Sequence, residues 1–368
     1  MPQHRPSAPA GSSPRAPGPV QVIPVTGLGE IRAGEDLPAV LAAAVREAGV
    51  QEGDVLCVST KIVSKSLGLS VPAARREAAI EAAAVRTIAR RRHTRLVTSV
   101  VQIASGPVLA AAGVDSSNAP EGPLLLPEDP DACAAELRSG LIAALGVRIG
   151  VVLTDTSSRV WRVGSGDIAL GAAGVASLQD LRGGADADGR PLTVTVRALA
   201  DELAAAADLV KGKASGVPAA IVRGVPGATA DDVPARDLSR TGADDWFRRP
   251  SLESVWVALG LAPAQEPIAR MSPEPAAERI ARALEVAALP RAGRRPRTAT
   301  AHLAEDATAE GGGEPRRILV TPGGADPADW VAAGELAERV RTALGAEAIA
   351  APLPPLTVVV THPQEDSR

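Results

Sequence analysis

The chain has 368 residues and a formal net charge of −4, with 45% hydrophobic and only 1% aromatic residues. That length allows two or three domains, whose cores must be built from Val, Leu, Ile and Ala. The acidic balance, and the lack of a basic stripe interleaved with aromatic residues, exclude a general nucleic-acid-binding role.

The first 19 residues are rich in Pro, Ser, Ala and Arg and contain no apolar run. We interpret residues 1–19 as a disordered tail rather than a secretory signal. No apolar stretch of the sequence reaches the ~18 residues that a membrane-spanning helix needs. The two cysteines, Cys57 and Cys133, do not form a disulfide scaffold and fit a reducing compartment. The sequence therefore predicts a cytoplasmic protein with no membrane partner.

Predicted strands and helices alternate through the first part of the chain. Val20–Pro24 predicts a strand, and Asp36 is placed to cap a helix with apolar residues at helical spacing. Val55–Ser59 predicts a buried strand whose end carries Thr60, Lys61, Ser64 and Lys65. Arg75–Arg92 predicts a helix that ends in three arginines, where they favour the helix dipole.

A second series of elements follows, opened by a helix that starts at Asp129-Pro130. The apolar pattern then predicts the strands Ile149–Leu153, Leu192–Val196 and Pro218–Val222. A Gly-rich stretch covers 170–189, and a helix is predicted over Ala198–Val210, ended by Gly212. We assign residues 20–250 to one domain. After it we expect a helical segment over 251–285, a linker over 286–315, and a small α/β segment over 316–368 with strands at Ile318–Val320 and Leu356–Val360 and a helix at Ala328–Leu344.

The segment from Ile149 to Gly164 carries the clearest chemical pattern. Its apolar run ends in Thr154-Asp155-Thr156-Ser157-Ser158, and Arg159 and Arg162 follow. Carboxylate and hydroxyl oxygens suit a hard cation such as Mg²⁺ or Mn²⁺, and arginines suit phosphates and carboxylates. A strand that delivers these groups at its carboxyl end indicates a site for a metal and an anionic substrate, although a capped turn is the alternative.

No complete nucleotide-binding motif is present. Gly212-Lys213 lacks the remainder of a P-loop, no G-x-G-x-x-G opens a βαβ unit, and the four histidines lack zinc spacing. Four polar clusters at the ends of apolar runs remain: Thr60/Lys61/Ser64/Lys65, Asp115/Ser116/Ser117/Asn118, Asp155/Thr156/Arg159/Arg162 and Lys211/Gly212/Lys213. Together they supply the carboxylates, hydroxyls and cations that phosphoryl transfer needs.

At these clusters the chain resembles the coenzyme F420-0:L-glutamate ligase family, the γ-glutamyl ligases of the deazaflavin cofactor. The resemblance runs in order over roughly residues 20–225 and rests on PVTGLGEI, GDVLCVSTKIVSKSLG, AAAGVDSSN, LLPEDPDA, TDTSSRVWR, DGRPL, and ADELAAAADLVKGK with VPAAIVRG. It implies the family's mixed α/β fold with mixed sheets, and a homodimer.

The resemblance also implies a GTP-dependent ligase. Such an enzyme activates the terminal carboxylate of F420-0 as an acyl phosphate, which the amine of L-glutamate then attacks. Further glutamates can be added through γ-linkages. The implied partners are F420-0, L-glutamate and GTP. The implied ions are Mg²⁺ or Mn²⁺, as one or two ions, with K⁺ as a further candidate.

Site residues are carried over from the matching motifs. The resemblance implies that GTP contacts come from Leu28, Gly29, Glu30, Ile31, Thr60, Lys65, Asn118, Lys211, Gly212 and Lys213. It implies that Asp115 and Asp155 hold one metal and Thr156 a second. Lys65 is also expected to act catalytically by adding positive charge near the phosphates. Arg159 and Arg162 are expected to hold the acidic tail of F420-0, with helix-end salt bridges as the alternative.

Two departures from the family's pattern affect these expectations. Ser157-Ser158 stands where the family usually has a glycine, so an altered turn is expected there. Actinobacterial relatives carry an FMN-binding, nitroreductase-like domain, but the tail here is too short for one. We expect a truncated remnant and no FMN. The alternative function is a degenerate paralogue that binds F420 or a nucleotide without ligating, and a third possibility is a ligase with a changed acceptor.

Overall fold

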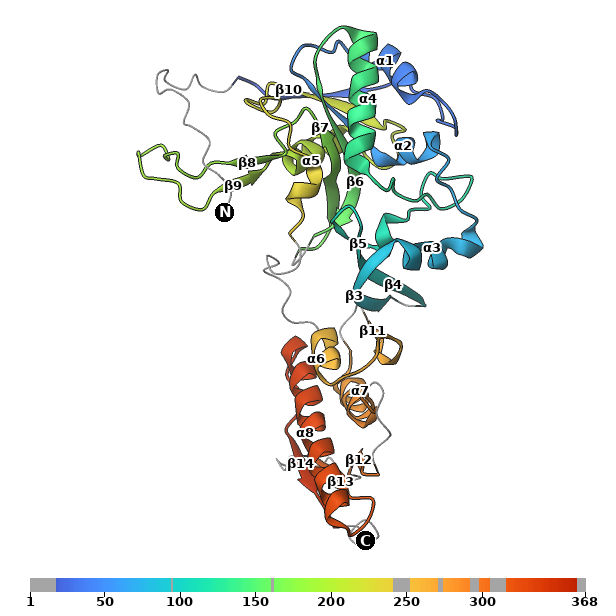
Figure 1. Cartoon of the computed structure of the whole chain (residues 1–368), viewed down its shortest axis with the longest axis vertical. Coiled ribbons are helices and arrows are strands. Elements are labelled where there is room, and N and C mark those ends of the chain that lie inside the picture. Colours follow the sequence, from blue (N-terminus) through green and yellow to red (C-terminus); the bar gives the residue numbers. More distant parts are fainter. Residues whose placement is uncertain are drawn as a thin grey trace. The chain divides into compact units, whose positions relative to one another are not determined.

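The computed structural model describes residues 18–93, 95–159, 162–240, 252–270, 274–291, 298–304 and 316–362. They form a mixed α/β fold, as predicted, with two compact units (Figure 1). The first unit comprises residues up to Val85 together with Gln102–Arg240, and the second comprises Arg86–Val101 together with residues from Thr241 onward. Residues 1–17 of the predicted tail lie outside the described ranges. Among the helices in those ranges, none is long and apolar enough to cross a membrane.

A mixed sheet of five described strands forms the centre of the first unit, in the order β1–β10–β2–β6–β7. The strands are β1 (Gln21–Val25), β2 (Val55–Ser59), β6 (Gly150–Ser158), β7 (Ser165–Ala173) and β10 (Ala219–Arg223). Strands β2 and β6 run parallel, and the other neighbours run antiparallel. Because the centre of this sheet is buried on both faces, its strands consist of continuous apolar runs rather than alternating patterns.

Helices cover both faces of this sheet (Figure 1). Helices α1 (Leu37–Glu47) and α4 (Pro130–Leu145) pack on the face that carries Leu56, and α5 (Leu199–Lys211) packs on the face that carries Cys57. The two predicted helix starts are confirmed. The Asp36 carboxylate accepts a hydrogen bond from the Ala39 N–H at 3.1 Å, and the Asp129 carboxylate accepts one from the Ala132 N–H at 3.0 Å.

The remaining elements of the first unit are short. They are α2 (Thr60–Ser66), α3 (Arg76–Ala83), β5 (Val108–Ala110), β8 (Leu178–Asp180), β9 (Val196–Ala198), and 3₁₀ turns at Ala73–Arg75, Ala111–Gly113 and Ala235–Leu238. The predicted strand Leu192–Val196 is wrong. Only its last residue is in a strand, because β9 pairs antiparallel with β8 through Val196–Ala198.

The predicted helix Arg75–Arg92 is also wrong over its second half. Helix α3 ends at Ala83, and β3 (Ala84–His93) follows, so the three arginines lie in a strand. In the second unit β3 pairs in parallel with β11 (Ala269–Arg270) and neighbours β4 (Leu96–Ile103). This pairing between distant segments, together with the β-branched residues of β3, overrides the helical charge pattern.

A second core lies in the C-terminal unit. Helices α6 (Leu252–Ala258), α7 (Ala276–Ala288) and α8 (Pro327–Ala350) pack with a sheet of β12 (Thr300–Leu303), β13 (Arg316–Thr321) and β14 (Leu356–Val360). The predicted strands and helix of this segment are confirmed. The linker predicted over 286–315 is wrong where the chain is described, because α7 reaches Ala288 and β12 pairs antiparallel with β13. The predicted helical segment 251–285 is interrupted by a 3₁₀ turn at Pro263–Gln265 and by β11.

Candidate functional site

Distant segments of the first unit meet at one edge of its five-stranded sheet. The strand register pairs Ala219 with both Val25 and Val58, so β1 and β2 end where β10 begins. Strand β6 reaches the same edge, because Thr154 pairs with Ser59. The loop after β1, the helix after β2 and the loop before β10 are therefore brought to one place.

Strand β6 is longer than the sequence indicated. Its polar residues Thr154–Ser158 continue the strand by pairing with β7, with Thr156 opposite Asp167 and Ser158 opposite Ser165. Asp155 and Thr156 thus lie within a strand rather than after its carboxyl end, and the turn expected at Ser157-Ser158 is wrong. The cause is the partner strand: β2 ends at Ser59, but β7 supplies backbone hydrogen bonds beyond that point.

A pocket of about 320 Å³, which we call the lysine pocket, lies at this edge of the sheet. Most of the predicted site residues line it: Gly29, Glu30, Ile31, Lys65, Asp115, Asn118, Asp155, Thr156, Lys211, Gly212 and Lys213. Among the other lining residues, Lys61 and Ser117 belong to the predicted polar clusters but were given no specific contact, and Asp167 and Asp208 were not predicted at all.

The remaining predicted site residues do not line this pocket. Leu28 packs against the core of the first unit, and Thr60 is fully buried with a hydroxyl that has no hydrogen-bond partner within the described ranges. Arg159 and Arg162 are exposed in the connection from β6 to β7, where the Arg162 N–H donates to the Arg159 carbonyl at 3.2 Å. They lie at no helix end, so the alternative of helix-end salt bridges is wrong, whereas their expected contact with the acidic tail of F420-0 stays a prediction.

Every lysine of the chain lines this pocket. The sequence has four lysines among 39 basic residues, and these are Lys61, Lys65, Lys211 and Lys213. All other basic positions are arginine. An ammonium group is a compact, strongly hydrated point charge, whereas a guanidinium is a broad planar fork. The restriction of lysine to these positions is a sequence signal that could have added Lys61 to the expected phosphate contacts.

Lys61 and Asp115 form an ion pair at one side of the pocket. The Lys61 Nζ lies 2.7 Å from the Asp115 Oδ2 and also donates to the carbonyl of Ser117 at 2.7 Å. The backbone N–H of Ser117 donates to the Asp115 Oδ1 at 2.7 Å. Partial burial opposes ionisation of Asp115, but the hydrogen bonds from Lys61 and Ser117 outweigh it and lower the pKa of Asp115 to about 2.

A second network lies beneath the opposite side of the pocket. The Lys211 Nζ lies 2.6 Å from the Asp167 Oδ2, and both side chains are more than nine-tenths buried. Asp167 also accepts hydrogen bonds from the hydroxyls of Thr154 at 2.9 Å and Thr156 at 3.0 Å. Burial opposes ionisation of Asp167, but Lys211 and the two hydroxyls hold its pKa below the usual carboxyl value. Lys213 hydrogen-bonds to the Thr156 hydroxyl from the solvent side.

Asp155 lies between these two networks and lacks a cationic partner among the described residues. Its burial, reinforced by the carboxylates of Asp167 and Asp115, raises the pKa of Asp155 to about 6. These three carboxylates therefore line one pocket, and Asp155 forms no ion pair with a described residue, although Lys61 opposes part of the pKa shift. This electrostatic deficit favours the binding of an additional positive charge.

The donors in the pocket fit a hard divalent cation, with one condition. Asp115, Asp155 and Thr156 supply carboxylate and hydroxyl oxygens, the ligand type that Mg²⁺ and Mn²⁺ prefer. No group of three or more His, Cys, Asp or Glu in the described ranges is close enough to hold a metal by itself. Lys61 engages Asp115 and Lys213 engages Thr156, so a cation at either oxygen has to displace an ammonium group.

Two further contacts shape the rim of the pocket. Lys65, near the end of α2, pairs with Glu30 in the loop after β1. The Asn118 side-chain amide donates to the Lys213 carbonyl at 3.3 Å. Between these segments Gly212 ends α5 at a φ of +59°, which a side chain would strain, so the chain turns sharply from Lys211 to Lys213.

Comparison with known proteins agrees with this geometry. The sequence profile of the F420-0:Gamma-glutamyl ligase family matches residues 27–224, a range that contains the whole lysine pocket. The coenzyme F420:L-glutamate ligase of Haloarcula marismortui is 36% identical over 263 residues, which cover 65% of this chain and 97% of that protein. The protein of the same name from Methanopyrus kandleri is 39% identical over 242 residues, covering 60% of this chain and 94% of that protein.

A third relative matches over a shorter stretch of this chain. The coenzyme F420:L-glutamate ligase of Natronomonas pharaonis is 40% identical over 226 residues, covering 55% of this chain and 86% of that protein. The profile match spans more than half of the chain, and these relatives align over most of their own length. This chain therefore belongs to the F420-0:gamma-glutamyl ligase family.

Proposed function

We propose that this chain joins L-glutamate to coenzyme F420-0, using GTP to activate a carboxylate as an acyl phosphate. The observation that carries the proposal is the lysine pocket, where four lysines and four aspartates from distant segments converge. Relatives named coenzyme F420:L-glutamate ligase support the two substrates. The chemistry of the pocket supports a polyphosphate co-substrate, because clustered ammonium groups suit phosphates.

The GTP phosphates are proposed to lie along the lysine pocket. Lys61, Lys65 and Lys213 bring ammonium groups to it, and Gly212 lines it with a backbone held at a φ of +59°. The segment Gly29–Ile31 and Asn118 would complete the contacts. Leu28 and Thr60 are left out of the proposed set, because neither lines the pocket.

A divalent cation, Mg²⁺ or Mn²⁺, is proposed to bind at Asp115 and Asp155, with a second at Thr156 and K⁺ as a further candidate ion. When bound, such an ion polarises the phosphoryl oxygens and neutralises their charge. The Lys211–Asp167 pair beneath the pocket orients Thr156. Lys65 is proposed to act catalytically by stabilising the charge that develops on the transferred phosphoryl group.

Two steps account for the proposed ligation. A carboxylate oxygen of F420-0 attacks the γ-phosphorus of GTP, so that an acyl phosphate forms and GDP leaves. The ammonium of L-glutamate loses a proton to water, and the resulting amine attacks the acyl carbon. The C–O bond to phosphate then breaks with its electron pair on the phosphate, and the nitrogen releases a second proton to the phosphate or water as the amide forms. The chain contributes mainly by positioning the reactants and supplying fixed charges.

The test is a mass-spectrometric assay of F420-0 incubated with the purified protein, GTP, L-glutamate and Mg²⁺ or Mn²⁺. The expected result is a ladder of glutamate increments, together with one GDP and one phosphate for each increment. Omission of GTP or of the divalent cation should abolish the ladder. Folded protein that leaves F420-0 unmodified under these conditions would refute the proposal. Sedimentation of the same sample tests the homodimer expected from the resemblance.

Two departures from the family pattern support the alternative of a degenerate, non-ligating paralogue, and the structure removes the first. An altered turn is expected at Ser157-Ser158, but these residues continue β6 and pair with Gly166 and Ser165. The other ground, the C-terminal departure, concerns the second unit, whereas the lysine pocket is formed by the first. Tight binding of F420 without consumption of GTP would favour the paralogue. An assay with a panel of amino acids in place of L-glutamate tests the third possibility, a ligase with a changed acceptor.

A further inference from the structure

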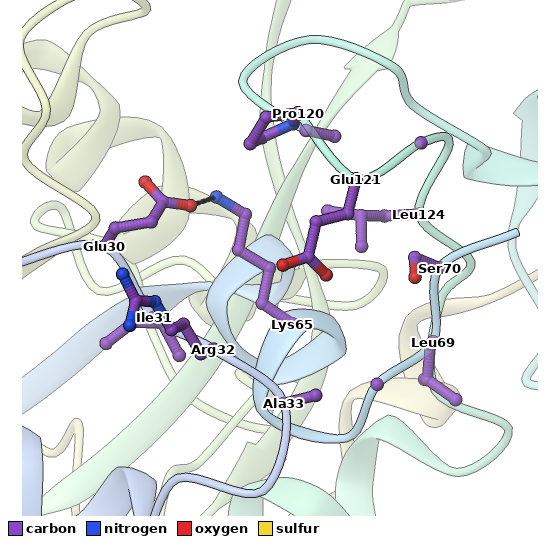
Figure 2. Close-up of a pocket in the computed structure, with 13 residues that line it drawn as sticks. Glu30, Ile31, Arg32, Ala33, Lys65, Leu69, Ser70, Pro120, Glu121 and Leu124 are labelled. Carbon is purple, nitrogen blue, oxygen red and sulfur yellow. Dashed lines mark hydrogen bonds and ion pairs between the residues drawn. The ribbon is translucent and has the colours of Figure 1, made fainter.

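A second pocket of the first unit adjoins the lysine pocket. It has a volume of about 320 Å³ and shares Glu30, Ile31 and Lys65 with the lysine pocket. Its other walls come from the segment after α2 and from the loop that follows Asn118. Figure 2 shows Lys65 drawn between Glu30 on one side and Glu121 on the other. A molecule in this second pocket would therefore be next to the proposed site of phosphoryl transfer.

The second pocket carries one unpaired cation and one unpaired anion. Lys65 is paired with Glu30, but Arg32 and Glu121 make no side-chain ion pair or hydrogen bond with any described residue. Both side chains are exposed at the pocket rather than buried under it. Its apolar walls include Ile31, Leu69 and Leu124, the first and last of which are buried in the protein. A ligand with both charges and a short aliphatic stem complements these walls.

Its unpaired charges distinguish this pocket from the lysine pocket. The four ionisable side chains that line it, Glu30, Arg32, Lys65 and Glu121, carry no net charge, and Lys65 is paired with Glu30. A ligand here therefore meets one unpaired cation and one unpaired carboxylate, whereas the lysines of the lysine pocket are engaged with Asp115, Glu30, Asp167 and Thr156. An amino acid carries an ammonium and carboxylates, so each of its charges can meet an opposite one here.

We infer that this second pocket binds the acceptor amino acid, with Arg32 holding a carboxylate and Glu121 holding the ammonium. The inference rests on the proposed function and deepens it by naming where L-glutamate sits. Glu121 and Lys65 line this pocket together, and Lys65 also lines the lysine pocket, so an ammonium held at Glu121 shares its pocket with a residue of the proposed phosphoryl-transfer site. After this nitrogen loses a proton, it is placed to attack the acyl phosphate.

The test compares the KM values for L-glutamate and for GTP in Arg32→Gln and Glu121→Gln. Each variant should raise the KM for L-glutamate at least about 10-fold, because a charge-assisted hydrogen bond is lost. Each should leave the KM for GTP within about twofold. The matched controls are Arg75→Gln and Glu128→Gln, exposed side chains outside both pockets that should change neither constant. Thermal melts check that all four variants remain folded.

The pattern of constants decides the assignment. A rise in the KM for GTP with an unchanged KM for L-glutamate would place the nucleotide base in this pocket, since a carboxylate can also accept hydrogen bonds from guanine. This outcome would overturn the inference. So would unchanged KM values for both substrates, or equal changes in the two KM values. If the wild-type chain proves inactive, saturation-transfer NMR with L-glutamate still decides. Binding of L-glutamate must weaken in Arg32→Gln and Glu121→Gln and persist in both controls. Any other pattern would overturn the inference. Because this readout does not depend on ligase activity, it is independent of the proposed function.

Discussion

Lys211 and Asp167 form a buried ion pair, with Nζ and Oδ2 2.6 Å apart, beneath the floor of the lysine pocket. Lys211 is the last residue of α5, and Asp167 lies in β7 opposite Thr156 of β6. The pair thus joins the helix that covers one face of the sheet to the two strands that carry the site. Its geometry sets the position of Thr156, whose hydroxyl donates to the same carboxylate.

Removal of one partner of this pair should be strongly destabilising. Lys211→Met or Asp167→Asn leaves the other group buried without compensation, at a cost of about 3–5 kcal/mol. Urea denaturation of the purified variants measures the change in the free energy of unfolding. Asp180→Asn is the matched control, because Asp180 pairs with Arg182 on the surface and its loss should not move the midpoint. Equal effects in the buried and surface variants would contradict the prediction.

Asp155 should make the metal-free protein less stable as the pH rises. Its pKa is raised from 3.8 to about 6, so between these values the folded protein holds a proton that the unfolded chain releases. The stabilising effect of that proton is complete at lower pH and is lost as the pH passes through about 6. Asp155→Asn should therefore increase the free energy of unfolding at neutral pH by at most about 3 kcal/mol. The melting temperature should rise accordingly.

Calorimetric melts across this pH range check the sign. The gain from Asp155→Asn should disappear under acid conditions, where the wild-type carboxyl is already protonated. Saturating Mn²⁺ should reverse the order at neutral pH, because the cation stabilises only the ionised wild-type group. A variant that is less stable than metal-free wild type at neutral pH would contradict the assigned environment.

Loss of either central carboxylate should abolish the proposed ligation. Asp115→Ala and Asp155→Ala each remove an oxygen ligand from the proposed cation site, and turnover should fall to background. The measurement is the rate of glutamate addition over a range of Mg²⁺ and Mn²⁺ concentrations. Asp231→Ala, at an exposed residue that lines neither pocket, is the control and should keep the wild-type rate. Wild-type rates in both pocket variants would refute the metal assignment.

Acetylation of lysine should inactivate the enzyme selectively. Because all four lysines line the pocket, an amine-acetylating reagent can modify only this site and the chain's N-terminal amine. Peptide mass spectrometry should find label at Lys61, Lys65 or Lys213 in step with the loss of activity, while buried Lys211 reacts last. GTP with a divalent cation should protect these positions but not the N-terminal amine. Full activity after complete labelling of the accessible lysines would contradict the prediction.

Local patterns were sufficient wherever one segment determines its own structure. The capped helix starts at Asp36 and Asp129, the strands β1, β2 and β10 of the central sheet, and the end of α5 at Gly212 all follow from short-range signals. Strand β7, which falls partly in the stretch interpreted as Gly-rich, was not predicted. Predictions failed where a partner strand decides the outcome. Strand β3 replaces the second half of a predicted helix because β11 and β4 flank it, and β6 runs past its apolar segment because β7 pairs with it.

The sequence by itself determined the family, the mixed α/β class and most of the pocket residues, because those depend on residue type and order. Only the tertiary structure decided which residues share the site. Sheet register brings Thr156 opposite Asp167, packing of α5 places Lys211 beneath them, and the β6–β7 connection leaves Arg159 and Arg162 outside the pocket. Residue type dictates local chemistry, whereas proximity between distant segments arises only when strands pair and helices pack on the sheet.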